Sequence, residues 1–118
     1  MVFSDLVPRA SITLVRRGVP VMGEREAHLL QAVEHVRSIK DGARDIGISY
    51  RTAWSAIQTM EQALGRPIVV SRAGGPGGGG TTLTDEGRSL LGAYRELHRR
   101  LDDEVVRGWE SSEEVVRS

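Results

Sequence analysis

The sequence lacks cysteine altogether, and this absence excludes disulfide bonds, thiolate catalysis and zinc or iron–sulfur sites built on cysteine. It also lacks any apolar run long enough for a signal-peptide core or a membrane span. We therefore expect a soluble cytoplasmic protein with no membrane partner. At 118 residues, the chain has the length of one domain with a single hydrophobic core.

An excess of charge of either sign is missing as well, because 16 basic residues balance 16 acidic ones. A neutral total argues against a nucleic-acid partner, but the charges are unevenly distributed. Residues 37–72 hold six basic and three acidic residues, a net +3, whereas residues 84–118 hold six and nine, a net −3. The total therefore conceals a basic middle and an acidic end.

The hydrophobic periodicity changes several times along the chain. Residues 1–10 show little pattern and are expected to form a flexible leader. Alternating β-favouring residues then predict a hairpin that turns at Arg17-Gly18, and helical spacing follows from Glu24. The predicted elements are, in order, strands 11–16 and 19–22, helices 24–36, 39–46 and 50–64, strands 67–72 and 81–83, and a helix from 84 to about 107. The last residues, 108–118, are expected to be an acidic, frayed tail.

Residues 39–64 have the pattern of a helix-turn-helix. Such a unit needs a small residue where its second helix crosses the first, and a glycine at the turn four residues later. Ala43 and Gly47 meet these needs. Ser38 and Ser49 are placed to cap the two helices, and Gly65 to end the second. Apolar residues suited to the inner side of the unit are Ile46, Ile48, Ala53, Ile57, Met60 and Leu64. The simpler alternative is a three-helix core with a tight glycine turn and no DNA ligand.

The predicted outer face of helix 50–64 is polar and holds a single acid, Glu61. Its other members are Tyr50, Arg51, Thr52, Ser55, Gln58, Thr59 and Gln62. Arginine, glutamine, serine and threonine side chains hydrogen-bond to base edges in the major groove. We expect base contacts from Arg51, Ser55 and Gln58, with Tyr50 and Thr52 shared between bases and backbone. The Tyr50 hydroxyl can reach a phosphate or a base, or simply cover the turn. For Trp54, packing against helix 39–46 or the following hairpin is favoured over stacking on DNA.

A glycine tract, residues 74–80, separates strands 67–72 and 81–83 and predicts a hairpin with a mobile tip. Three helices followed by two strands make a winged helix, in which this hairpin is the wing. The expected phosphate contacts are Ser49, Lys40, Arg44, Arg72 and the amides of Gly77, Gly78 and Gly79. The tract also suggests a phosphate-binding loop, but that motif needs lysine where Gly80 stands and a helix directly after it.

The last predicted helix carries an apolar stripe at 4-3-4 spacing, formed by Leu90, Tyr94, Leu97 and Leu101. This stripe can complete the domain's own core or pair with its copy in a second subunit. We favour a homodimer, because a long terminal helix exposes more apolar surface than a small domain covers. Paired recognition helices would read a palindromic site with half-sites about one helical turn apart.

No catalytic or cofactor constellation stands out. His28, His35 and His98 are too scattered to form a metal site, and no Ser–His–Asp or paired-carboxylate pattern appears. We therefore predict a protein that is not an enzyme and that needs no cofactor.

Three segments together resemble a known family: Gly47-Ile48-Ser49-Tyr50-Arg51-Thr52-Ala53-Trp54, the glycine-rich run from Ser71 to Gly80, and Leu83-Thr84-Asp85-Glu86-Gly87. They are similar to the N-terminal DNA-binding domain of ModE-type molybdate-responsive regulators and, more distantly, to the winged domains of LysR-type regulators. The resemblance covers roughly residues 11–107. It implies a winged helix-turn-helix that dimerises through its last helix and binds palindromic operators. Members of that family carry molybdate-binding domains further along the chain, and no molybdate site is expected within this sequence.

The sequence therefore predicts an α+β, mainly α fold, with a DNA-binding domain at 11–83 and a dimerisation helix at 84–107. The predicted function is a sequence-specific regulator of transcription that binds double-stranded DNA. The alternative is a winged-helix adaptor that binds other proteins, supported by the zero net charge and the absence of a sensor motif.

Overall fold

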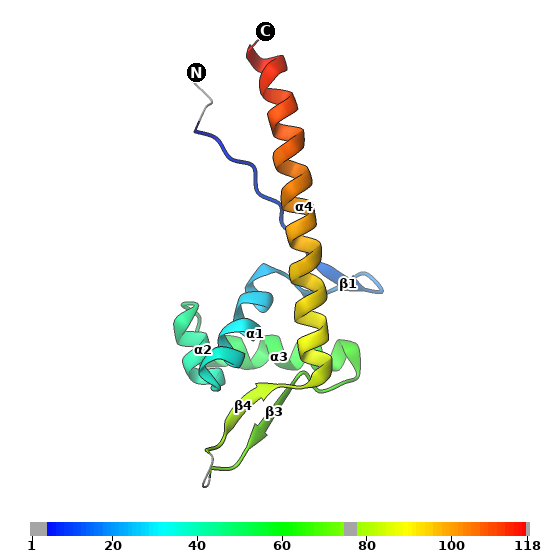
Figure 1. The fold of residues 1–118 in the computed structure, drawn as a ribbon. Coiled ribbons are helices and arrows are strands. Elements are labelled where there is room, and N and C mark those ends of the chain that lie inside the picture. Colours follow the sequence, from blue (N-terminus) through cyan, green and yellow to red (C-terminus); the bar gives the residue numbers. More distant parts are fainter. Residues whose placement is uncertain (1–4, 75–77, 118) are drawn as a thin grey trace.

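The computed structural model shows four helices and two separate two-stranded sheets (Figure 1). It describes residues 5–74 and 78–117, and for 113–117 the backbone alone. The elements are β1 (Leu14–Arg16), β2 (Val19–Met22), α1 (Glu24–Val36), α2 (Ile39–Asp45), α3 (Tyr50–Leu64), β3 (Val69–Arg72), β4 (Gly80–Leu83) and α4 (Asp85–Arg117). The predicted order of elements is confirmed.

The core lies where α1 meets α3, the start of α4 and the strand ends. Leu29, Leu30 and Val33 of α1 are fully buried, and they recur at the helical spacing that the sequence predicts. The other buried apolar residues come from every neighbouring element and include Met22, Ala53, Ile57, Met60, Ile68, Leu83 and Leu91. Helices α2 and α3, which form the predicted helix-turn-helix, thus pack on a single core. This packing holds their outer faces in a fixed arrangement.

The turn between α2 and α3 forms as its local chemistry predicts. The Ser38 Oγ accepts a hydrogen bond from the Asp41 amide at 3.0 Å, and the Ser49 Oγ accepts one from the Thr52 amide at 3.0 Å. Gly47 has a φ of +76°, a conformation that favours glycine. Ala43 is buried at the crossing, as a helix-turn-helix requires.

The wing is the antiparallel hairpin of β3 and β4, with Val69 opposite Leu83 and Arg72 opposite Gly80. Its base is held by the end of α1, where Arg37 has a left-handed φ of 61° and its carbonyl accepts the Thr81 amide at 2.9 Å. A Cβ on Gly80 would lie 2.6 Å from that carbonyl oxygen, so only glycine fits there. The angle of the wing is therefore set by a backbone contact with the core helices.

Helix α4 is longer than predicted, since it runs on to Arg117 rather than ending near residue 107. The prediction of a frayed tail at 108–118 is thus wrong for residues 108–117, which are helical. No proline or cap residue interrupts this stretch, and the Ser111 and Ser112 hydroxyls bond back to the carbonyls of Arg107 and Gly108. The helix stands away from the domain, opposite in direction to the wing, and the molecule is 65 Å long (Figure 1).

Strand β1 is shorter than predicted, because it begins at Leu14 and not at Ser11. Its partner β2 gives way to α1 after Gly23, so residues 11–13 have no strand to pair with. The chain before β1 instead runs beside α4 (Figure 1). There the Ala10 amide donates to Asp102 Oδ1 at 3.3 Å, and the Ala10 carbonyl lies 3.2 Å from His98 Nε2. Ala10, at the end of the predicted flexible leader, is therefore bound to α4.

Candidate nucleic-acid interface

The outer face of α3 is an open surface of polar side chains. Tyr50, Arg51, Ser55 and Gln58 are exposed, as are Thr59 and Gln62. Within the described part of the chain, Arg51 takes part in no ion pair, so its guanidinium is available to a ligand. The structure thus brings the predicted base-contacting residues onto one face, and α3 has the bounds that its sequence predicts.

The first turn of α3 uses part of its predicted phosphate-binding chemistry for its own cap. The Ser49 hydroxyl donates to Thr52 Oγ1 at 2.9 Å while accepting the Thr52 amide. The Ser49 hydroxyl is therefore fully engaged, whereas the Thr52 hydroxyl accepts one hydrogen bond and keeps its own proton to donate, and Thr52 is partly exposed. The backbone amides left for a phosphate are those of Tyr50 and Arg51, because the Thr52 amide is bonded to Ser49.

Glu61 does not belong to the outer face, which corrects its predicted place. Its carboxylate points to the base of the wing, where Oε2 accepts the Ile68 amide at 2.8 Å and the Val69 amide at 3.4 Å. This contact could not be predicted from the sequence, because the Ile68 and Val69 amides that donate to Glu61 lie beyond the end of the helix. As a result, the face of α3 open to a ligand is free of acidic side chains.

A cleft of about 370 Å³, which we call the aromatic hollow, separates α3 from the wing. Its walls include Ser38, Lys40, Tyr50, Trp54, Val69 and Ser71, with Arg37 and Gly80 at one edge. Trp54 lines this cleft together with residues of α2 and the wing, but 42% of its surface is exposed and it is not among the residues packed against the core, so its packing role stays a prediction. Lys40 reaches the same cleft, which puts a cation beside the start of α3.

Arg44, the other basic residue predicted on α2, is partly neutralised. Its Nη1 lies 3.5 Å from Asp41 Oδ1, and both side chains are largely exposed. An exposed pair of this kind is weak and can open for a phosphate.

The two faces of the wing differ, and the predicted contact Arg72 lies on only one of them. Ser71 and Thr81 share the face toward the aromatic hollow, where their hydroxyl oxygens are 2.8 Å apart. Arg72 is one residue further along β3 and therefore projects from the opposite face. Gly78 is exposed and Gly79 half-exposed near the tip, whereas Gly77 lies outside the described residues. Because Gly80 opens a strand and not a helix, the phosphate-binding loop is excluded.

The predicted dimerisation stripe on α4 divides into two parts. Tyr94 is buried in the core of its own chain, and its hydroxyl donates to the Ile12 carbonyl at 2.8 Å. Burial, together with the nearby charges of Glu24 and Glu26, raises the pKa of this tyrosine. Leu90 is partly buried and also packs against the core, so this end of the stripe completes the chain's own core, the other alternative that the sequence offers. Leu97 and Leu101, by contrast, are 42% and 38% exposed.

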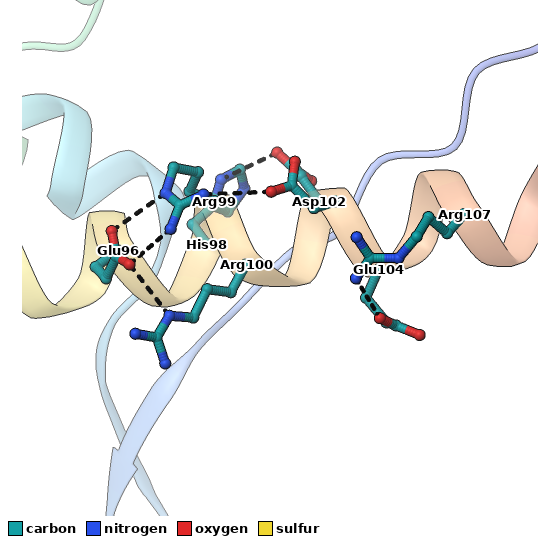
Figure 2. A network of polar contacts seen from close by, with 8 residues as sticks. Glu96, His98, Arg99, Arg100, Asp102, Glu104 and Arg107 are labelled. Carbon is teal, nitrogen blue, oxygen red and sulfur yellow. Dashed lines mark hydrogen bonds and ion pairs between the residues drawn. The ribbon is translucent and has the colours of Figure 1, made fainter.

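The polar side of α4 is covered by ion pairs within the helix (Figure 2). Glu96 accepts from Arg99 at 2.7 Å and from Arg100 at 3.1 Å, and Glu104 pairs with Arg107. These hydrogen bonds lower the pKa of Glu96 to about 2. The arginines of this region are thus already matched by carboxylates of the same helix.

Among the described residues, no group of three histidine, aspartate or glutamate side chains is placed to hold a metal ion. Nor does any described helix combine the length and apolar character needed to cross a bilayer.

Comparison with solved structures supports the fold assignment. The DNA-binding domain in the crystal structure of a CbnR_DBD–DNA complex superposes on 80% of this chain, and on 99% of its own chain, with a TM-score of 0.54. The two sequences are 22% identical, so this likeness concerns the fold alone. It confirms the predicted winged-helix architecture.

Curated relatives share more of the sequence. The chain is 41% identical over 83 residues to the molybdenum-pterin-binding protein MopB of Rhodobacter capsulatus, covering 70% of this chain and 30% of that protein. It is 39% identical over 95 residues to the molybdenum transport protein ModE of Azotobacter vinelandii, covering 80% and 35%. With the DNA-binding transcriptional dual regulator ModE of Escherichia coli K12, it shares 48% over 71 residues, covering 59% and 27%. The chain thus spans about a third of the length of these relatives.

The resemblance predicted from residues 47–54 and the wing is confirmed by these relatives. The family model for bacterial regulatory helix-turn-helix proteins of the LysR family matches residues 25–88, from α1 through the wing to the first turn of α4. The chain belongs to the LysR family of bacterial regulatory helix-turn-helix proteins.

Proposed function

We propose that this protein is a sequence-specific regulator of transcription that binds double-stranded DNA with α3 in the major groove. The observation that carries the proposal is the acid-free outer face of α3, with Glu61 turned away and Arg51 in no ion pair with any residue that the structure describes. Membership of the LysR family and the ModE regulators among the relatives support it. The activity is one of binding, without catalysis, and a chromosomal ligand would place it in the cytoplasm.

Roles follow from the positions of the side chains. Arg51, Ser55 and Gln58 contact base edges, and Tyr50 and Thr52 contact bases and backbone from the first turn. Phosphates are bound by Lys40, Arg44 and Arg72, and by the amides near Ser49 and at Gly78 and Gly79. Arginine is suited to guanine O6 and N7, and glutamine to adenine N6 and N7, so the site is expected to contain both base types.

The regulator acts as a homodimer in this proposal. Leu97, Leu101 and Val106 leave apolar surface exposed on the part of α4 beyond the core. Pairing this surface with its copy would bury it and place two α3 helices on a two-fold symmetric site. The DNA-binding unit then consists of residues 11–83 with the first turns of α4, and the rest of α4 forms the subunit contact.

Selection from a random-sequence duplex library on the purified protein tests the proposal. We expect an inverted repeat whose half-sites lie about one helical turn apart. The Arg51→Ala, Gln58→Ala double variant, selected in parallel, should recover no such repeat, whereas Arg99→Ala on α4 should recover the wild-type sequence. A wild-type pool without an enriched motif, together with no retention on random duplex at low salt, would favour the protein-binding adaptor instead.

A further inference from the structure

A second cleft lies on the far side of the wing from α3. It has a volume of about 320 Å³, and its walls are Glu34, Arg37, Arg72, Gly80, Thr82 and Arg88. We call it the arginine hollow. Its three guanidiniums come from the end of α1, from β3 and from the first turn of α4. The fold thus gathers three cations that are distant in sequence around one open space.

The single acid of the arginine hollow is already engaged. Glu34 Oε2 accepts the Leu83 amide at 3.0 Å, and Oε1 pairs with Arg88 Nη2 at 3.1 Å. Arg88 is also 3.5 Å from Asp85, whose side chain is fully exposed. Among the described residues, Arg37 and Arg72 have no carboxylate within ion-pair distance. With three cations and one anion in its walls, the hollow carries a net charge of +2.

The hollow is continuous with the surface proposed to bind DNA. Arg72 and Thr82 project from the face of the wing opposite to Ser71 and Thr81. Arg37 and Gly80 line both the aromatic hollow and the arginine hollow. A duplex held by α3 and the wing would therefore continue past the wing toward these arginines.

We infer that the arginine hollow binds phosphate groups of the DNA backbone outside the segment gripped by α3 and the wing. Guanidinium groups bind phosphate oxygens through paired, charge-assisted hydrogen bonds, and Thr82 adds a hydroxyl. The hollow is open, and the Arg88 side chain is 51% exposed, which suits a long polymer better than a small enclosed anion. This inference rests on the proposed function. It extends the surface that contacts DNA by adding Arg37 and Arg88.

Two duplexes with the selected sequence test the inference, one ending at the repeat and one extended by about ten base pairs on each side. Wild-type protein should bind the extended duplex about tenfold more tightly, since each charge-assisted phosphate contact adds appreciable affinity. The Arg37→Gln, Arg88→Gln double variant should lose that gain and bind the short duplex as before. Its dependence on salt with the extended duplex should weaken by about two released counterions per subunit, or about four per dimer.

Two further variants make the experiment specific. The Arg100→Gln, Arg107→Gln double variant removes the same charge from α4 and should keep the full gain from the flanks. Glu34→Gln keeps an oxygen for the Leu83 amide but removes the negative charge, so it should raise affinity for the extended duplex only. Circular dichroism melts would verify that every variant is folded.

The outcomes separate this inference from the proposed function. If wild-type protein selects a repeat but gains nothing from the flanks, or if Arg37→Gln, Arg88→Gln keeps the gain, the inference is wrong and the function stands. If wild-type protein binds neither duplex, both the inference and the proposed function are wrong. Titration with inorganic phosphate at constant ionic strength distinguishes a free-anion pocket: the guanidinium resonances of Arg37 and Arg88 should shift with the extended duplex and stay unchanged in millimolar phosphate. The reverse result would overturn the inference.

Discussion

Helices α3 and α4 are both amphipathic, but they use their charged residues in opposite ways. On α3, Arg51 forms no ion pair within residues 5–74 and 78–112, and the helix's acid, Glu61, is turned to the wing. On α4, arginines and carboxylates alternate at three- and four-residue spacing and bind one another (Figure 2). The comparison shows that the number of basic residues on a helix does not decide whether the helix can bind DNA. What decides it is whether nearby acidic side chains already pair with those basic residues.

The same comparison explains the neutral total. Helix α4 contains nine acidic and six basic residues, a net −3, so the rest of the chain carries +3. Four of these acids, Asp85, Glu96, Asp103 and Glu104, pair with arginines of α4 itself, and from Glu96 onward the helix runs away from α3 and the wing (Figure 1). A protein with no net charge can therefore present a basic surface to a polyanion.

The largest expected effect concerns the unpaired arginine of α3. Arg51→Ala should weaken binding to the selected duplex by about 1–3 kcal/mol and relax the preference for one base pair. Arg99→Ala on α4 should change neither, because Arg99 is paired with Glu96 and Asp103. Fluorescence anisotropy with the selected duplex and with single-base variants measures both. If both substitutions weakened binding equally on every DNA sequence, the proposed difference between α3 and α4 would be wrong.

The next effect concerns Glu61, the acidic residue of α3 that points to the wing and not to the outer face. Glu61→Ala removes the acceptor of the Ile68 amide and should lower the free energy of unfolding by about 1–2 kcal/mol. Glu104→Ala, which removes an exposed partner of Arg107, should change it by less than about 0.5 kcal/mol. Urea denaturation compares the two. A Glu61→Ala variant of wild-type stability would mean that Glu61 does not hold the wing.

A smaller effect is expected at Lys40, beside the start of α3. Lys40→Ala should weaken binding to all duplexes alike and reduce the slope of log K against log salt by about one. Arg100→Ala is the matched control on α4, where Glu96 already accepts a hydrogen bond from the arginine, and its slope should equal that of wild type. Sequence-dependent losses from Lys40→Ala would assign this residue to base contact instead.

The smallest effect is a pH dependence of α4. The hydrogen bonds from Arg99 and Arg100 lower the pKa of Glu96 from 4.5 to about 2. A lowered carboxylate pKa stabilises the folded protein above pH 4.5, and that contribution is lost as the pH falls to about 2. The melting temperature of Glu96→Gln should therefore lie slightly below that of wild type at pH 7 and equal it at pH 2. A difference that persists at pH 2 would exclude this charge effect.

The features predictable from the sequence are those that local chemistry decides. The caps Ser38 and Ser49, the turn at Gly47 and the bounds 24–36 and 50–64 depend on residues within one turn of each other. They formed as predicted, and so did the side-chain set on α3.

The features that escaped prediction depend on packing between distant segments. Tyr94 and Leu97 are equivalent members of one stripe in the sequence, but only Tyr94 lies beside α1 and Ile12. Arg37 and Arg88 carry no sequence pattern that links them, and they line one cleft only because the end of α1, the start of α4 and strand β4 pack together. The arrangement of polar side chains on α3 was therefore predictable from the sequence and the cleft beside the wing was not, while the DNA contacts of both elements stay predictions.

The way the wing is attached also bears on aggregation. A two-stranded sheet has two open edges, and an exposed edge can accept a strand from another copy of the chain. On β4 the outward amides of Thr81 and Leu83 are already bonded, to the Arg37 carbonyl and to the Glu34 carboxylate. The protein can thus expose its hairpin to a ligand while the β4 edge stays closed to strand addition.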